Sequence, residues 1–146
     1  MIKNRKAYHD FEIIETYEAG MVLVAGEVKA LKMNKASLKE AFVSVIKGEA
    51  YLKNSHFSIP EYISFDRPDE KRDKKLLLKK KEILKIEEKV KLQNLTVIPL
   101  EIYKSRHLFK IKIALARGLK KYDKREKLKK KQEDLKVRRE LKKILF

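Results

Sequence analysis

The sequence has no cysteine and no tryptophan, only four glycines and three prolines among 146 residues. Without cysteine it cannot form disulfides, a thiolate zinc site or a cysteine nucleophile. Its three histidines, His9, His56 and His107, lie far apart and form no HExxH-like cluster. We therefore expect no bound metal and no cofactor.

Long apolar runs are also missing. The longest run, MVLVA at 21–25, is far too short to cross a bilayer. The first ten residues, MIKNRKAYHD, lack the apolar core of a secretion signal. We therefore expect a cytoplasmic protein that does not bind membranes. Apolar residues still make up 43% of the chain, enough to build a folded core.

Negative charge is scarce, because 38 Lys and Arg stand against 21 Asp and Glu, a net charge of +17. Such an excess makes a compact chain repel itself and favours a polyanionic partner. Residues 117–146 carry 14 Lys/Arg and 5 Asp/Glu, a net +9. This segment has no Gly or Pro after Gly118 and few apolar residues, so we predict a folded domain at 1–122 and a basic tail at 123–146 that is helical when bound. The alternative is a solvated helix or disordered tail without a function.

Two hairpins are predicted in the body of the chain. The first joins residues 41–46 to 50–52 through a Lys47-Gly48-Glu49 turn. The second joins residues 95–103 to 107–116, and Pro99 indicates an edge or a bulge within it.

The last strand of the second hairpin alternates strictly. Its alternation predicts that Leu108, Lys110 and Lys112 face water. It predicts that Phe109, Ile111 and Ile113 face the core. One face of this hairpin is therefore predicted to be wet and basic.

Other segments are less regular. Residues 11–16 are predicted as a strand that ends before a Glu18-Ala19-Gly20 turn, and residues 21–31 fit a helix or a strand. Residues 58–73 are predicted as a long loop. Residues 74–93 are predicted as the best helix, with Leu77 on its core-facing side.

These elements predict a mainly β protein with helices: a small closed OB-like β-barrel with packed helices and a basic tail. Barrels of this kind bind nucleic acid through an outer face and loops. Composition and pattern alone predict a cytoplasmic RNA-binding barrel.

A series of short blocks then gives a family resemblance. In order, they lie at 4–7, 9–11, 14–20, 26–29, 75–78, 97–100 with Tyr103, 110–118 and 122–126. In this order and spacing the chain resembles the SsrA-binding protein family, small protein B. The resemblance implies an OB-like barrel that binds transfer-messenger RNA and delivers it to stalled ribosomes in trans-translation, leading to ribosome rescue and tagging of the nascent chain. It implies two partners, transfer-messenger RNA and the ribosome (small-subunit RNA, decoding site and messenger channel), and a monomeric protein.

The resemblance also implies site residues. The expected RNA-binding set is Asn4, Arg5, Lys6, Ala7, His9, Glu18, Leu77, Arg117, Gly118, Lys120, Lys124 and Arg125. The expected ribosome-binding tail set is Lys127, Lys129, Lys130, Lys131, Lys136, Arg138, Arg139, Lys142 and Lys143. The cations suit phosphates, whereas a carboxylate such as Glu18 suits a base amino group or a ribose hydroxyl, or orients a neighbouring cation. Three positions depart from the family pattern, with Lys74 in place of Arg, Lys79 in place of His and Leu119 in place of Lys.

Two other classes of protein are alternatives for this sequence. A basic structural ribosomal protein or a general OB-fold translation factor would share the composition. An enzyme is not expected, because the carboxylates at 12, 15 and 18 and at 66, 69 and 73 have no nucleophile–base set beside them and no Gly-rich phosphate loop is present.

Overall fold

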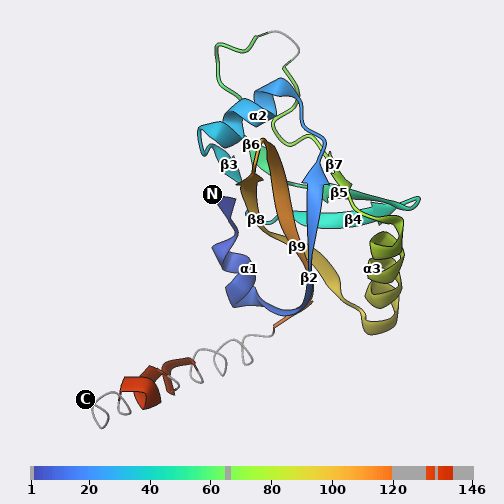
Figure 1. Ribbon diagram of the computed structural model, residues 1–146, viewed down its shortest axis with the longest axis vertical. Coiled ribbons are helices and arrows are strands. Elements are labelled where there is room, and N and C mark those ends of the chain that lie inside the picture. The colour runs from blue at the N-terminus through green and yellow to red at the C-terminus, as the bar shows by residue number, and fades with distance from the viewer. Residues whose placement is uncertain (1, 65–66, 120–130, 134, 140–146) are drawn as a thin grey trace.

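The computed structural model describes residues 2–64, 67–119, 131–133 and 135–139, and its centre is a strongly curved β-sheet (Figure 1). The strands are β1 (Ile2–Lys3), β2 (Phe11–Met21), β3 (Ala36–Ser37), β4 (Phe42–Ile46), β5 (Glu49–Lys53), β6 (His56–Phe57), β7 (Lys74–Leu77), β8 (Thr96–Ser105) and β9 (Leu108–Gly118). The helices are α1 (Arg5–Asp10), α2 (Ala25–Lys32) and α3 (Lys80–Gln93).

The main sheet closes on itself. Its strand order is β1-β8-β4-β5-β7-β2-β9, and β9 also pairs with β8, so that β8, β4, β5, β7, β2 and β9 form an antiparallel ring. Closure removes most exposed sheet edges. The predicted mainly β fold with packed helices is confirmed, and the closed sheet has the form expected of an OB-like barrel.

Both predicted hairpins are confirmed. The β4–β5 turn has positive φ at Lys47 (50°) and Gly48 (75°), the backbone that a tight two-residue hairpin turn requires. In β8 the register shifts between Pro99 and Glu101, which confirms the bulge.

The interior follows the predicted alternation of β9. Phe109, Ile111 and Ile113 are buried in the main core. Toward the end of β9 the outer face is buried too, because Ala7 of α1 packs there against the small side chains of Ala114 and Ala116. Helix α1 therefore covers one end of the outer sheet face and leaves the other end open.

Three expectations were wrong. Residues 74–77 are strand β7 and not helix, because Leu76 and Leu77 pair with β2, so that the helix begins only at Lys80. Leu77 is consequently 53% exposed and does not face the core. Glu18-Ala19-Gly20 is not a turn, since β2 runs on to Met21 against β9.

The remaining segments agree with one of the predicted readings. Residues 25–32 form helix α2, which decides the helix-or-strand alternative for most of 21–31. Residues 58–64 and 67–73, the described parts of the predicted loop, contain no helix or strand.

A buried ion cluster fixes this loop to the barrel. The Glu27 carboxylate is fully buried and accepts hydrogen bonds from Arg72 Nη2 (2.6 Å), Arg72 Nε (3.1 Å) and the Val24 N–H (3.0 Å). Lys74 Nζ, also fully buried, lies 3.5 Å from Glu27 Oε2 and donates to Ser55 Oγ at 3.2 Å. Burial alone would raise the pKa of Glu27, but the hydrogen bonds from Arg72 and Val24 and the nearby cations lower it overall.

Substitution Glu27→Gln removes the ion-pair partner of the buried Lys74. We expect it to lower the free energy of unfolding at pH 7 by about 3–5 kcal/mol, measured by urea denaturation. Glu88→Gln, which removes an exposed carboxylate from α3, is the control and should change stability by no more than about 0.5 kcal/mol.

The contribution of Glu27 to stability should depend on pH. Because the pKa of Glu27 is lower when folded than its ordinary value of 4.5, its contribution is complete above that value and is lost as the pH falls through the folded pKa. The stability difference between the native protein and Glu27→Gln should therefore shrink in acid. A stability difference that stays constant down to pH 3 would contradict this role. So would an equal loss of unfolding free energy in Glu27→Gln and in the control Glu88→Gln.

Candidate nucleic-acid interface

Helix α1 presents one group of the expected RNA-binding residues. Arg5 and Lys6 are exposed, and His9 is half-exposed with its Nδ1 3.0 Å from Asp10 Oδ1. Two cations thus stand on a helix that is seated on the outer sheet face, where they are free to meet phosphates.

Asn4 and Ala7 do not belong to the exposed part of this group. Asn4 is buried: its Nδ2 donates to the Pro99 carbonyl (3.0 Å) and its backbone N–H donates to the Leu100 carbonyl (2.8 Å). Ala7 is 3% exposed. Both residues hold α1 on the barrel and so position Arg5 and Lys6, and their place in the expected RNA-binding set stays a prediction.

The end of β9 lies beside α1. Gly118 pairs with Phe11, and the Leu119 N–H donates to the Asp10 carbonyl at 2.9 Å. Arg117 is half-exposed, and its Nη1 lies 3.7 Å from Glu12 Oε2. The structure thus brings the expected Arg117–Gly118 element next to α1. The expected Lys120, Lys124 and Arg125 lie outside the described residues.

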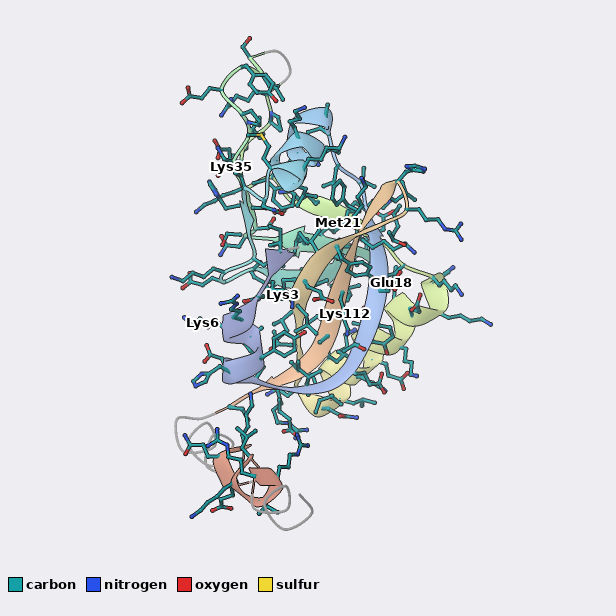
Figure 2. The ribbon with its side chains drawn as sticks, turned by 60° about the vertical axis from the view of Figure 1, so that its left-hand side comes forward. Lys3, Lys6, Glu18, Met21, Lys35 and Lys112 are labelled. Carbon is teal, nitrogen blue, oxygen red and sulfur yellow. The ribbon has the colours of Figure 1, made fainter. Side chains whose placement is uncertain are left out.

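Beyond the cover of α1, the same sheet face is open to solvent. We define the open sheet face by Glu18 on β2, Glu101 and Tyr103 on β8, and Lys110 and Lys112 on β9. Strand pairing aligns four charges of alternating sign across it, in the order Lys3, Glu101, Lys112 and Glu18. Figure 2 labels three of these side chains, Lys3, Lys112 and Glu18, along this row.

Glu18 is held in its charged form. Lys110 Nζ lies 2.9 Å from its Oε1, and hydrogen bonds from Lys110 and Tyr103 lower the pKa of the Glu18 carboxyl. Burial and the hydrogen bond to Glu18 raise the pKa of Tyr103 to about 12. Tyr103 is therefore a permanent hydroxyl donor at neutral pH, and Glu18 is a fixed acceptor on an otherwise basic surface.

Leu77 joins Glu18 on this face. It lies on β7 opposite Gly20 of β2, and a Cβ at Gly20 would come within 3.3 Å of the Leu77 Cβ. Gly20 is also opposite Lys110. The strand pairing therefore brings the expected residues Glu18 and Leu77 together, although they are 59 positions apart in the sequence.

The tail is described only in part. Residues 131–133 and 135–139 are helical and exposed, so Lys131, Lys136, Arg138 and Arg139 present their charges to solvent. The other expected tail cations, Lys127, Lys129, Lys130, Lys142 and Lys143, lie outside the described residues.

The departures from the family pattern differ in kind. Lys74 is buried in the ion cluster with Glu27, so it is no phosphate contact. Lys79 is exposed at the start of α3, where its backbone N–H donates to Glu82 Oε1 at 3.2 Å.

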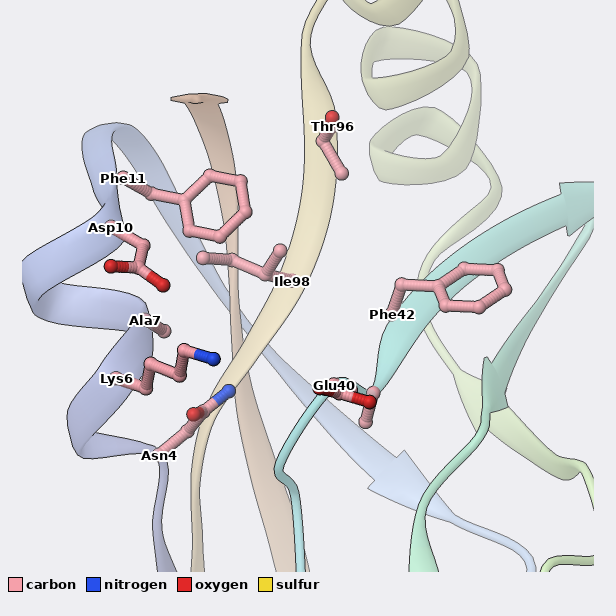
Figure 3. A pocket seen from close by; sticks show the side chains of 10 residues that line it. Asn4, Lys6, Ala7, Asp10, Phe11, Glu40, Phe42, Thr96 and Ile98 are labelled. Atoms are coloured by element: carbon pink, nitrogen blue, oxygen red, sulfur yellow. The ribbon is translucent and has the colours of Figure 1, made fainter. Parts of the chain in front are cut away.

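A hollow of about 250 Å³ lies on the other side of α1, against the start of β4 (Figure 3). Phe11, Phe42 and Ile98 line it, with Lys6 and Glu40 at its rim. Its walls are mainly apolar, and it has no set of groups suited to catalysis.

The three glutamates weighed as possible catalytic acids are engaged by cations. Arg117 pairs with Glu12, Lys89 with Glu15 and Lys110 with Glu18. Within the ranges that the structure describes, no cluster of three or more potential metal ligands occurs. Nor does the described chain contain a helix that is long and apolar enough to span a membrane.

Sequence reasoning missed Glu101, Lys110 and Lys112 as site residues. The alternation of β9 did predict a basic wet face at Lys110 and Lys112. Nothing in the sequence placed Glu101 beside them, because that contact depends on the bulge at Pro99, which sets which β8 side chains face outward.

Comparison with known proteins agrees with this picture. A profile of the SmpB protein family matches residues 1–143. An SsrA-binding protein of Campylobacter curvus is 44% identical over 147 residues, covering 99% of this chain and 98% of the relative, and one of Fusobacterium nucleatum is 45% identical over 95% of this chain and 94% of the relative. A solved chain described under "tmRNA-SmpB: a journey to the center of the bacterial ribosome" is 40% identical, covers 86% of this chain and 92% of its own length, and superposes with a TM-score of 0.68. This chain belongs to the SmpB family.

Proposed function

We propose that this protein binds transfer-messenger RNA and delivers it to stalled ribosomes in trans-translation, which frees the ribosome and tags the unfinished chain for degradation. The observation that carries the proposal is the surface on which α1 and the open sheet face meet, in a chain of the SmpB family. Relatives named SsrA-binding proteins, and a solved relative described with transfer-messenger RNA and the ribosome, support it.

The residues of this surface suit RNA in different ways. Arg5, Lys6 and Lys112 supply positive charge for phosphates. Glu18 would be repelled by phosphate and instead accepts from a ribose hydroxyl or a base amino group. Leu77 offers an exposed apolar contact to a base or sugar.

The protein acts by binding and not by catalysis, and it works in the cytoplasm where ribosomes are. A structural ribosomal protein is the alternative for so basic a chain. A high-salt wash of ribosomes separates the two, because a delivery factor is released and a structural subunit stays bound.

Affinity for the tRNA-like part of transfer-messenger RNA should depend steeply on salt. If the surface contacts ~6–10 phosphates, affinity should fall by ~10³–10⁵ between 50 and 200 mM salt, because each neutralised phosphate releases counterions. Filter binding over a salt series measures this. A flat response would contradict an interface based on phosphates.

Arg5→Ala should weaken RNA binding roughly tenfold and lower the salt slope by about one, while the melting temperature stays the same, since Arg5 is exposed. Glu18→Ala and Lys124→Ala should also weaken binding.

Asn4→Ala should lower the melting temperature, because it breaks the buried hydrogen bond to Pro99.

Lys91→Ala is the matched control, because it removes the same charge from an exposed residue of α3, the helix that lies across the barrel from α1 (Figure 1). An equal loss of RNA affinity in Arg5→Ala and Lys91→Ala would show that only the net charge of the protein matters. That result would remove the assignment of this surface.

The tail should be separable from RNA binding. Deletion of residues 128–146 should leave affinity for transfer-messenger RNA within about tenfold, because the barrel supplies the main contacts. It should abolish tagging of stalled chains in a reconstituted translation assay, since the basic tail is proposed to enter a groove walled by ribosomal RNA, the vacant messenger channel. Normal tagging, or complete loss of RNA binding, would refute this division and the boundary near residue 122.

A further inference from the structure

The open sheet face contains a polar hollow. It has a volume of about 330 Å³ and is lined by Thr16, Tyr17, Glu18, Glu101, Tyr103 and Lys112. This is at the small end of ligand-pocket sizes, which suits a single planar group better than a folded segment.

Glu101 is the unusual member of this lining. It is half-buried between Lys3 and Lys112 in the strand register, yet the described part of the chain contains no hydrogen bond or ion pair to its carboxylate. Glu18, on the other side of Lys112, is by contrast already held by Lys110 and Tyr103. An uncommitted carboxylate in a hollow is an acceptor available to a ligand.

A phosphate does not fit between two carboxylates, so the ligand must bring N–H or O–H donors. Among the four RNA bases, guanine alone offers two neighbouring donors, N1–H and the N2 amino group, which match the two oxygens of one carboxylate. Its O6 acceptor lies next to them, and Lys112 lies next to Glu101. Adenine and cytosine offer one amino group each, and uracil offers one ring N–H.

Aromatic rings flank the hollow. Tyr103 stands on the same strand face as Glu101, two residues away. Tyr17 of β2 lines the hollow as well. Single-stranded RNA is read in this manner, through the Watson–Crick edges of unstacked bases packed against aromatic side chains.

We propose that this hollow binds one unpaired guanine of the RNA, with Glu101 accepting from N1–H and N2–H and Lys112 donating to O6. The inference rests on the proposed function, and it adds sequence readout to a surface otherwise suited to phosphates. It assigns base recognition to Glu101, which has no role in the expected site.

Kethoxal footprinting of full-length transfer-messenger RNA tests the assignment, because kethoxal reacts at N1 and N2 of unpaired guanines. At saturating protein, the native chain should protect at least one unpaired guanine. Glu101→Gln should leave that guanine reactive and weaken binding about tenfold, the loss expected for one bidentate base contact. Glu88→Gln on α3 is the control and should protect it as the native protein does.

Lys112→Gln is the second variant and keeps Glu101 in place. It should reduce protection at the same guanine, and it replaces Glu101→Gln if that variant does not melt cooperatively. Native kethoxal patterns in both variants would overturn the inference. Loss of dimethyl sulfate protection at an adenine or cytosine, with kethoxal protection unchanged, would overturn the choice of guanine. Failure of the native protein to bind the RNA at all would overturn the proposed function, and the inference with it.

Discussion

The pairing of β9 with both β2 and β8 is the constraint on which the rest of the molecule depends. This one strand closes the ring, and the alternation of its side chains determines the character of both the inner and the outer face of the sheet. Its inward side chains build the core. Its outward side chains change along the strand from lysines to alanines, and the alanines admit α1 while the lysines stay open to solvent. The candidate interface is therefore a consequence of how the barrel closes.

Charge is arranged so that a strongly basic chain can fold and still bind an anion. The buried Glu27 carboxylate pairs with both Arg72 and Lys74 and ties the long loop to the barrel. The glutamates along β2 each form an ion pair with one cation, as Glu15 does with Lys89. Arg5 and Lys6 on α1 are exposed, and their positive charge can meet RNA without first breaking a buried pair.

The sequence predicts a segment's secondary structure where local pattern determines it. It fails where pairing with a distant strand determines it. The β8–β9 hairpin and the basic face at Lys110 and Lys112 follow from period-two alternation and could be predicted, and Pro99 indicated an edge or a bulge within the hairpin. Residues 74–77 could not, because helix-forming lysines and leucines there are recruited into β7 by pairing with β2 and β5. The burial of Asn4 and the place of Glu101 were equally out of reach, since each depends on the bulge of a strand about a hundred residues from the N-terminus.

The central claim is that RNA lies across α1 and the open sheet face, and the absence of cysteine allows a direct test. A single cysteine introduced by Lys3→Cys carries an iron chelate beside this surface (Figure 2). One introduced by Lys91→Cys carries it on α3, the helix that lies across the barrel from α1 (Figure 1). In the complex with transfer-messenger RNA, hydroxyl radicals from position 3 should cut a compact stretch of the tRNA-like part, while those from position 91 should cut it weakly. Equal cutting from both positions, or stronger cutting from position 91, would contradict the account.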